Sequence, residues 1–327
     1  MVFSLDLTRP PTAKERARLT GRLWRLRRSD LADQMARVGE LLPAPKSGKL
    51  VIRTNFSFRS ARVDDDASDR RAPRPEFRPP ATRLIRSRGS ALRFAVTLLA
   101  LAQGHHRAGH RARLADLGLP VVGDSQQSGW ADLVITDATD SDGKDFIRVR
   151  DKRARSVRSA LRALEDAGLV RIPTVPGGLK DFTLLDERGV DVVKELEEYK
   201  VPAHESVFDV PDGFISSGWL HVLEDSEIAL LLMVACGAGG QREGRYLVMP
   251  SETRLLHYGI HRDAFSSARK TLEWFGLLDV EEYQRHDDGR AENGELRVHR
   301  LALNEDGFTR PAVATMTDVL ESQMERK

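Results

Sequence analysis

The side chains of this sequence best suited to chemistry are cations crowded into one short segment. Seven lysines and arginines lie between positions 148 and 162, and Asp151 is the only acidic residue among them. The seven are Arg148, Arg150, Lys152, Arg153, Arg155, Arg158 and Arg162. Guanidinium groups bind phosphate oxygens and fork onto base edges, but they do not act as proton acceptors. The cluster therefore predicts recognition of a polyanion rather than covalent catalysis.

Other residue types that serve catalysis or metal binding lack the partners they need. The histidines at 105, 106 and 110 have no cysteine or carboxylate pair at ligand spacing. The glycines of segment 237–244 follow an expected helix and lack the lysine of a phosphate-binding loop. The motifs H-E-x-x-H and G-x-S-x-G are both missing. We expect no enzymatic activity, no cofactor and no metal site.

The charge of the chain is divided unevenly between its two ends. Residues 1–90 carry 21 Lys and Arg against 10 Asp and Glu, whereas residues 186–327 carry 16 against 28. A basic half of this kind predicts a polyanionic partner, because clustered cations release counterions from phosphates on binding. The alternative is that the basic and acidic halves neutralise each other within the folded protein.

A helix with a basic surface is expected near the N-terminus. Apolar residues recur every three to five positions from Leu19 to Leu42, so residues 12–42 predict one long helix or two helices broken near Ser29. Thr12 is a candidate N-cap. Six arginines lie in the first half of this segment: Arg16, Arg18, Arg22, Arg25, Arg27 and Arg28. Such a helix suits nucleic acid, a partner helix or an anionic membrane surface, and simple packing on a neighbouring domain is the alternative.

Two apolar segments predict helices buried within a core. Residues 91–103 and 226–236 are apolar nearly all round, and Ser226 is a candidate N-cap for the second. The longest uninterrupted apolar run, Ile228–Cys236, has nine residues, too few to cross a bilayer. The single cysteine, Cys236, is expected to be a buried small hydrophobe, which fits a reducing cytoplasm.

Each apolar helix is followed by a similar stretch of sequence, which suggests an internal repeat. Residues 157–172 and 265–280 align at an offset of 108, with identities such as Leu164/Leu272, Gly168/Gly276 and Leu169/Leu277. Each predicts a helix that ends at glycine and leads into a β-hairpin. The first hairpin turns through residues 176–178, and the second turns through the polar segment 286–294.

Both parts of the chain have the same expected order of elements: an apolar helix, a further helix, a helix that ends in glycine, and a β-hairpin. This is the order of elements in a winged helix-turn-helix, and the chain resembles that DNA-binding superfamily twice. The resemblance is carried by residues 161–170 (LRALEDAGLV) and 271–278 (TLEWFGLL). It implies a mainly α fold with small β-hairpin wings (α+β), built from two tandem winged-helix domains plus a basic N-terminal helix. About 50 residues separate the first apolar helix from the basic helix, against about 25 in the second unit, which implies an insertion near 124–145.

The expected organisation follows from these patterns and from a length that suits two domains. The expected parts are a basic helical arm (1–42), a flexible Pro-rich linker (43–89), winged-helix domain 1 (90–185), an acidic connector (186–212), winged-helix domain 2 (213–304) and a C-terminal tail or helix (305–327). Pro73, Pro75, Pro79 and Pro80 argue for an extended linker.

The resemblance also implies which residues touch DNA. In the first domain the helix carrying the cation cluster would enter the major groove, with Ser159 beside the arginines and with Arg171 and Lys180 on the wing. The corresponding outward residues of the second domain are close to neutral, namely Asp263, Ser266, Ser267 and Lys270, with Arg262 and Arg269 at the margins. Of these, Arg262, Ser266, Ser267 and Lys270 are the expected DNA contacts. The second domain is equally compatible with a role in dimerisation or docking.

The leading hypothesis is a sequence-specific protein that binds double-stranded DNA, a bacterial transcriptional regulator of the cytoplasm associated with the nucleoid. The resemblance extends to plasmid replication initiators that bind repeated origin sequences without nicking, which is the first alternative. The second is a protein-interaction or dimerisation module with non-specific DNA binding. Its acidic C-terminal half would recruit a second copy or a protein partner. No membrane span is expected.

Overall fold

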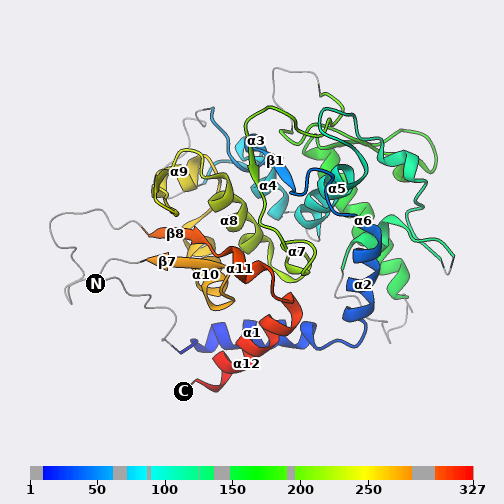
Figure 1. Cartoon of the computed structure of the whole chain (residues 1–327). Coiled ribbons are helices and arrows are strands. Elements are labelled where there is room, and N and C mark those ends of the chain that lie inside the picture. The colour runs from blue at the N-terminus through cyan, green and yellow to red at the C-terminus, as the bar shows by residue number, and fades with distance from the viewer. Residues whose placement is uncertain are drawn as a thin grey trace. The chain divides into compact units, whose positions relative to one another are not determined.

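The computed structural model describes residues 10–61, 72–86, 90–124, 126–135, 148–189, 196–281 and 299–326. It is predominantly helical with small antiparallel sheets, which confirms the expected α+β class. The chain divides into two compact units, each assembled from separate segments, and Figure 1 labels most of their elements. Unit 1 contains Met1–Arg27, Ser57–Arg78 and Pro211–Lys327, and unit 2 contains Arg28–Phe56 and Pro79–Val210. Residues 213–304 thus fall in unit 1 and residues 90–185 in unit 2.

Unit 2 is organised around α5 (Ala91–His105), which is buried on nearly every side because its residues are apolar all round. It packs against α6 (Val149–Asp166), and the short helical turn η4 (Trp130–Leu133) packs against both α6 and α2 (Leu31–Leu41). The other helices are α3 (Thr54–Ser57), α4 (Pro80–Arg83), η2 (Leu84–Arg86), η3 (Leu114–Leu117) and η5 (Gly178–Lys180). The last residue of α3, Ser57, is assigned to unit 1. Strands β1 (Val51–Arg53) and β4 (Val207–Asp209) pair antiparallel, as do β2 (Val170–Arg171) and β3 (Thr183–Leu184).

Part of the segment 43–89, expected to be a flexible linker, is packed into unit 2. Ile52 of β1 lies opposite Phe208 of β4 and is fully buried. The side chain of Gln103 accepts a hydrogen bond of 3.0 Å from the Val51 amide and donates one of 2.6 Å to the Val51 carbonyl. Gly104 gives Pro43 room, since a Cβ there would lie 2.6 Å from the proline carbonyl oxygen. Composition did not predict this packing, because it depends on partners far away in the sequence. The acidic centre of the segment, residues 62–71, lies outside the described residues.

Unit 1 has an apolar helix, α8 (Asp225–Cys236), packed against α10 (Arg262–Trp274). Its four-stranded antiparallel sheet has the order β5-β6-β8-β7, with Leu301 of β8 paired to Leu247 on one side and Val280 on the other. The strands are β5 (Gln241–Glu243), β6 (Tyr246–Val248), β7 (Leu278–Glu281) and β8 (Arg300–Leu303). The remaining helices are α1 (Ala13–Leu26), η1 (Pro75–Phe77), α7 (Trp219–Val222), α9 (Ser251–Leu256), α11 (Glu305–Phe308) and α12 (Ala312–Glu325). The expected turn at 286–294 lies outside the described residues.

Two helix starts are set by local capping boxes, and one of the two differs from the prediction. The N-terminal sequence forms two helices, separated at residues 27–30, and Thr12 caps α1 as expected, in a reciprocal pair with Glu15. Ser226 is not an N-cap, and that prediction is wrong. Helix α8 begins two residues earlier because Glu224 and Glu227 form a capping box there. Cys236, at the end of α8, is half-buried.

The two helix ends that align at the offset of 108 have the same backbone geometry. Gly168 and Gly276 adopt φ values of 72° and 67°, a conformation that glycine tolerates best. The next amide returns to the helix in both units, from Leu169 to the Leu164 carbonyl at 2.8 Å and from Leu277 to the Leu272 carbonyl at 2.9 Å. Each of these leucines then accepts a hydrogen bond from the returning chain, from Leu185 in unit 2 and Asn304 in unit 1. A glycine stop therefore starts each hairpin in the same way.

Candidate nucleic-acid interface

Helix α6 has one face fixed in the core and one face turned to solvent. Ala154, Val157, Ala160, Leu161 and Leu164 are buried, at the spacing of three and four residues that defines one side of a helix. The opposite side exposes Arg155, Arg158, Ser159 and Arg162, and Arg148 and Arg150 are exposed at the N-terminal end of the helix. Because the apolar side is anchored on α5, the cationic side is presented by a rigid element.

The exposed arginines of α6 are not neutralised within the described part of the chain. None of the five guanidinium groups makes a hydrogen bond or ion pair there with another described residue, although Arg150 is close enough to help lower the pKa of Asp124. The larger cause of that lower pKa is the pair of backbone amides, of Gln126 and Gln127, that donate to Asp124. The surface therefore retains donors for an external anion.

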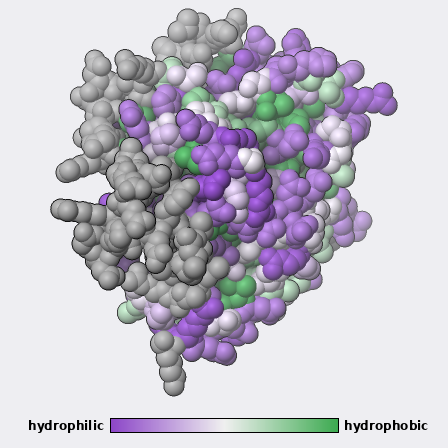
Figure 2. Space-filling model, turned by 60° about the vertical axis from the view of Figure 1, so that its left-hand side comes forward, coloured by the Kyte–Doolittle hydropathy of each residue, from purple (hydrophilic) through white to green (hydrophobic). Residues whose placement is uncertain are grey.

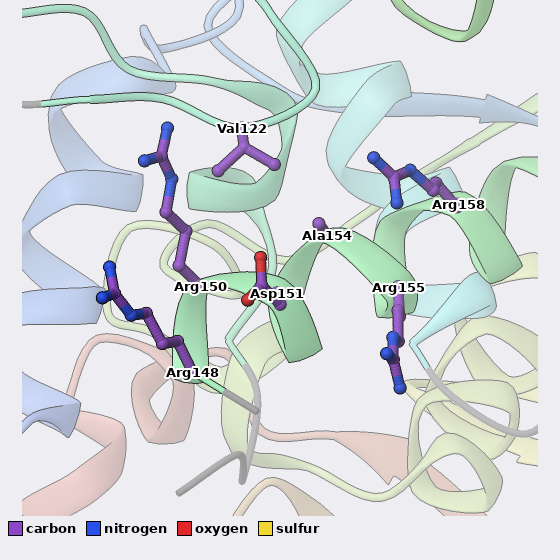
Figure 3. A pocket seen from close by; sticks show the side chains of 7 residues that line it. All are labelled: Val122, Arg148, Arg150, Asp151, Ala154, Arg155 and Arg158. Atoms are coloured by element: carbon purple, nitrogen blue, oxygen red, sulfur yellow. The ribbon is translucent and has the colours of Figure 1, made fainter. Parts of the chain in front are cut away.

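Four of these arginines surround one hollow of about 510 Å³. Figure 3 shows Arg150 and Arg158 on either side, with Asp151 and Ala154 between them and Val122 opposite. The wall that carries Val122 is held against η4, since the amides of Trp130 and Ala131 donate to the carbonyls of Pro120 and Val121 at 2.9 and 3.0 Å. The lining residues are Val122, Arg148, Arg150, Asp151, Ala154, Arg155 and Arg158.

Two members of the predicted cluster lie away from the open surface. The side chain of Arg153 is 15% exposed, and its guanidinium lies 3.7 Å from the carboxylate of Asp30. Burial lowers the pKa of Arg153, and the carboxylates of Asp132 and Asp30 counteract this effect. Lys152 is half-buried and has an interaction of its own within the protein. Arg153 thus joins α6 to Asp30, and sequence spacing alone did not separate these two cations from the exposed arginines.

The hairpin after α6 exposes both of its expected contact residues, Arg171 and Lys180. Its tip is a tight turn in which the Gly178 amide donates to the Val175 carbonyl at 3.0 Å, with Pro176 second and Gly177 third at φ 81°. This is the geometry of a type II turn. The segment that follows the turn is held by Trp130, whose indole N–H donates to the Lys180 carbonyl at 3.3 Å.

The outward face of α10 is largely covered by α1, and sequence reasoning missed this. Lys270 donates to Glu15 of α1 at 2.9 Å, and Ser267 is hydrogen-bonded to Arg18 of α1. Arg269 is buried, and only Arg262, Asp263 and Ser266 at the start of α10 are fully exposed. Two of the four predicted contacts in unit 1 are thus already engaged.

The arginines of α1 are likewise paired within unit 1. Arg22 is buried and forms a bidentate ion pair with Glu227, with both hydrogen bonds at 2.6 Å. Arg18 binds Glu224 at 2.7 Å, and Arg27 binds Glu321 at 2.5 Å. The alternative in which basic and acidic ends neutralise each other therefore describes α1. A local signal for it existed, because Arg22 lies on the apolar stripe between Leu19 and Leu26.

Side-chain character elsewhere offers few competing sites. The described residues on the face in Figure 2 are mostly hydrophilic, with hydrophobic side chains in small separate patches among them. Within the described residues, no three His, Cys, Asp or Glu side chains are placed to hold a metal ion, and no helix is long and apolar enough to span a membrane. No protein-family model, curated protein sequence or solved structure matches this chain.

Proposed function

We propose that this protein binds double-stranded DNA in a sequence-specific manner and acts as a transcriptional regulator, with α6 in the major groove. The observation that carries the proposal is the cationic surface formed by the outward face of α6 and its N-terminal end, where five exposed arginines make no ion pair with another described residue. An α-helix fits the major groove of B-DNA, and arginine there forks onto guanine O6 and N7.

The surroundings of α6 support this role. The helix leads through Gly168 into a hairpin that exposes Arg171 and Lys180, residues suited to the phosphate backbone. In unit 1 the helices α8, α9 and α10 are followed by the antiparallel pair β7 and β8, which is also the order of helices and hairpin expected of a winged helix, with the strands β5 and β6 between α8 and α9. We propose that both units are winged-helix domains and that only unit 2 reads DNA.

Charge and coverage argue against unit 1 as a reader of DNA. Its candidate helix, α10, is engaged by α1 at Ser267 and Lys270. Beneath α1 lie the carboxylates of Glu224 and Glu227, which would repel phosphates if α1 left. This face suits an arginine-bearing helix rather than DNA, in agreement with a docking role for the second domain.

A second candidate function uses the same α6 face. The matching helix ends at Gly168 and Gly276 support a duplicated architecture, as in plasmid replication initiators that bind repeated origin sequences without nicking. A regulator and an initiator differ in the target sequence, since an initiator requires several closely spaced copies of its site.

The test is a selection of random duplex DNA by the full chain at about 0.15 M salt, followed by binding measurements on variants. We expect a defined motif for the wild type. The variant Arg155→Ala/Arg158→Ala should lose on the order of 1 to 3 kcal/mol of binding free energy per base contact. The control Arg107→Ala/Arg113→Ala removes the same charge from exposed positions of unit 2 outside α6 and should bind nearly as the wild type.

Three results would contradict the proposal. Unchanged binding by a folded Arg155→Ala/Arg158→Ala variant would remove α6 from the interface. Retention of DNA without a motif would leave a non-specific binder. No retention at any salt concentration would favour the interaction-module alternative.

A further inference from the structure

Asp151 is an acid placed within a surface of arginines. It is exposed, and it lines the same hollow as Arg148, Arg150, Arg155 and Arg158. Figure 3 shows the carboxylate of Asp151 between Arg150 on one side and Arg158 on the other, directed toward the same side of the helix as Ala154. No hydrogen bond or ion pair joins this carboxylate to another described side chain. The hollow therefore combines many donors with one unused acceptor.

A carboxylate at this place weakens a site designed for phosphate alone. Asp151 is in the first turn of α6, where the helix dipole favours a negative charge modestly. An acidic residue anywhere in the first turn would interact with the helix dipole equally well. At position 151, however, the carboxylate also lies next to any anion that the arginines attract. Repulsion between the carboxylate and phosphate oxygens opposes non-specific binding.

Base edges differ from phosphates because some of them donate hydrogen bonds. In the major groove cytosine offers its N4 amino group, which an ionised aspartate accepts. Adenine also offers an amino group, at N6, but the acceptor N7 beside it repels a carboxylate and suits asparagine instead. The first turns of a helix in the groove are the part that reaches base edges.

We propose that Asp151 is a specificity-determining residue that accepts a hydrogen bond from cytosine N4, so that the hollow reads a base edge flanked by arginine contacts. The inference rests on the proposed function and deepens it. Asp151 selects the base pair at one position of the target, and its charge suppresses binding to other DNA.

The experiment compares the full-length wild type with Asp151→Ala, Asp151→Asn and Asp166→Ala in the same selection from random duplex DNA. Asp166 is the matched control, since it is an exposed acid on α6 outside the hollow. Asp151→Ala should lose the preference for cytosine at one position, with discrimination falling about tenfold, while its affinity for unrelated DNA rises severalfold. Asp151→Asn should shift that position toward adenine. Asp166→Ala should keep the wild-type motif.

The outcomes separate this inference from the proposed function. A wild-type motif that Asp151→Ala retains at every position would overturn the role of Asp151 and leave DNA binding by α6 intact. The same change of motif in Asp166→Ala would also overturn it, because the effect would then be one of net charge. A wild type that selects no motif would overturn the specific function itself, and the inference with it.

Discussion

The carboxylate of Glu227 accepts two hydrogen bonds of 2.6 Å from the guanidinium of Arg22, and both side chains are buried in unit 1. A third hydrogen bond, from the Thr271 hydroxyl, reaches the same carboxylate at 2.6 Å. Burial by itself would raise the pKa of Glu227, but Arg22 and the hydrogen bonds outweigh it and lower the pKa. The pair joins α1 to α8 and, through Thr271, to α10.

Removing one member of this pair should destabilise unit 1 strongly. Arg22→Ala leaves the charge of Glu227 buried without its partner, which typically costs about 3 to 5 kcal/mol. Urea unfolding followed by circular dichroism measures the loss. Arg25→Ala is the control, because Arg25 is 40% exposed and lies 3.9 Å from Glu224, and it should cost less than about 1 kcal/mol. Equal losses in the two variants would show that the buried pair is not special.

The basic helix α1 should contribute little to the salt dependence of DNA binding. Arg18 is paired with Glu224 at 2.7 Å, so we expect it to neutralise no phosphate. Its side chain therefore releases no counterions from DNA. Arg18→Ala should therefore leave the slope of log K against log salt unchanged, while Arg162→Ala, on the open face of α6, should reduce it by about 0.9 if that residue contacts a phosphate. A lower slope for Arg18→Ala would place α1 on DNA.

A buried acid in unit 2 should make stability depend on pH near neutrality. Burial raises the pKa of Glu187 to about 7, although the Arg53 guanidinium 2.5 Å away lowers it. Because the folded pKa lies above the unfolded value, the folded state binds the extra proton and stability falls as pH rises from about 4.5 to 7. Glu187→Gln does not titrate, so its destabilisation relative to the wild type should be smaller at pH 8 than at pH 5. Denaturant midpoints at both pH values measure this, and a difference that grows with pH would refute it.

Replacing glycine by alanine should lower the stability of the protein at some positions and raise it at others. Gly168 and Gly276 adopt φ values of 72° and 67°, so alanine at either should cost about 1 kcal/mol or more. At Gly276 the new Cβ would also lie 2.6 Å from the Arg310 guanidinium. Gly21→Ala in α1 should instead stabilise by roughly 0.5 to 1 kcal/mol, since its Cβ meets no atom within 4 Å. Thermal unfolding of the three variants tests the sign.

Helices were predictable from sequence where the relevant signal is local. The apolar run of α5 and the glycine stops of α6 and α10 depend on residues within one or two turns. The open face of α6 was predictable for the same reason, since Ala154, Val157 and Leu161 fix which side is buried.

The errors concern contacts between residues far apart in the sequence. Nothing near Ser267 or Lys270 indicates that α1, about 250 residues earlier, covers them. The same holds for β1, whose partner β4 begins at Val207. Arg153 resembled its exposed neighbours because its partner, Asp30, is also distant. Helical spacing predicts which side of a helix is polar, but not which polar residues have a partner within the protein.

The segmented composition of unit 1 has a consequence for synthesis of the chain. Arg22 and Glu227 are separated by 205 residues, so α1 leaves the ribosome long before its carboxylate partner exists. At 5 to 20 residues per second this interval is roughly 10 to 40 s. During this interval α1 is an arginine-rich segment whose acidic partners, Glu224 and Glu227, have not yet been synthesised. A nascent chain stalled before residue 224 would keep that polycation exposed, whereas unit 2 has all of its residues by Val210. Unit 2 can therefore fold first, and α1 docks last.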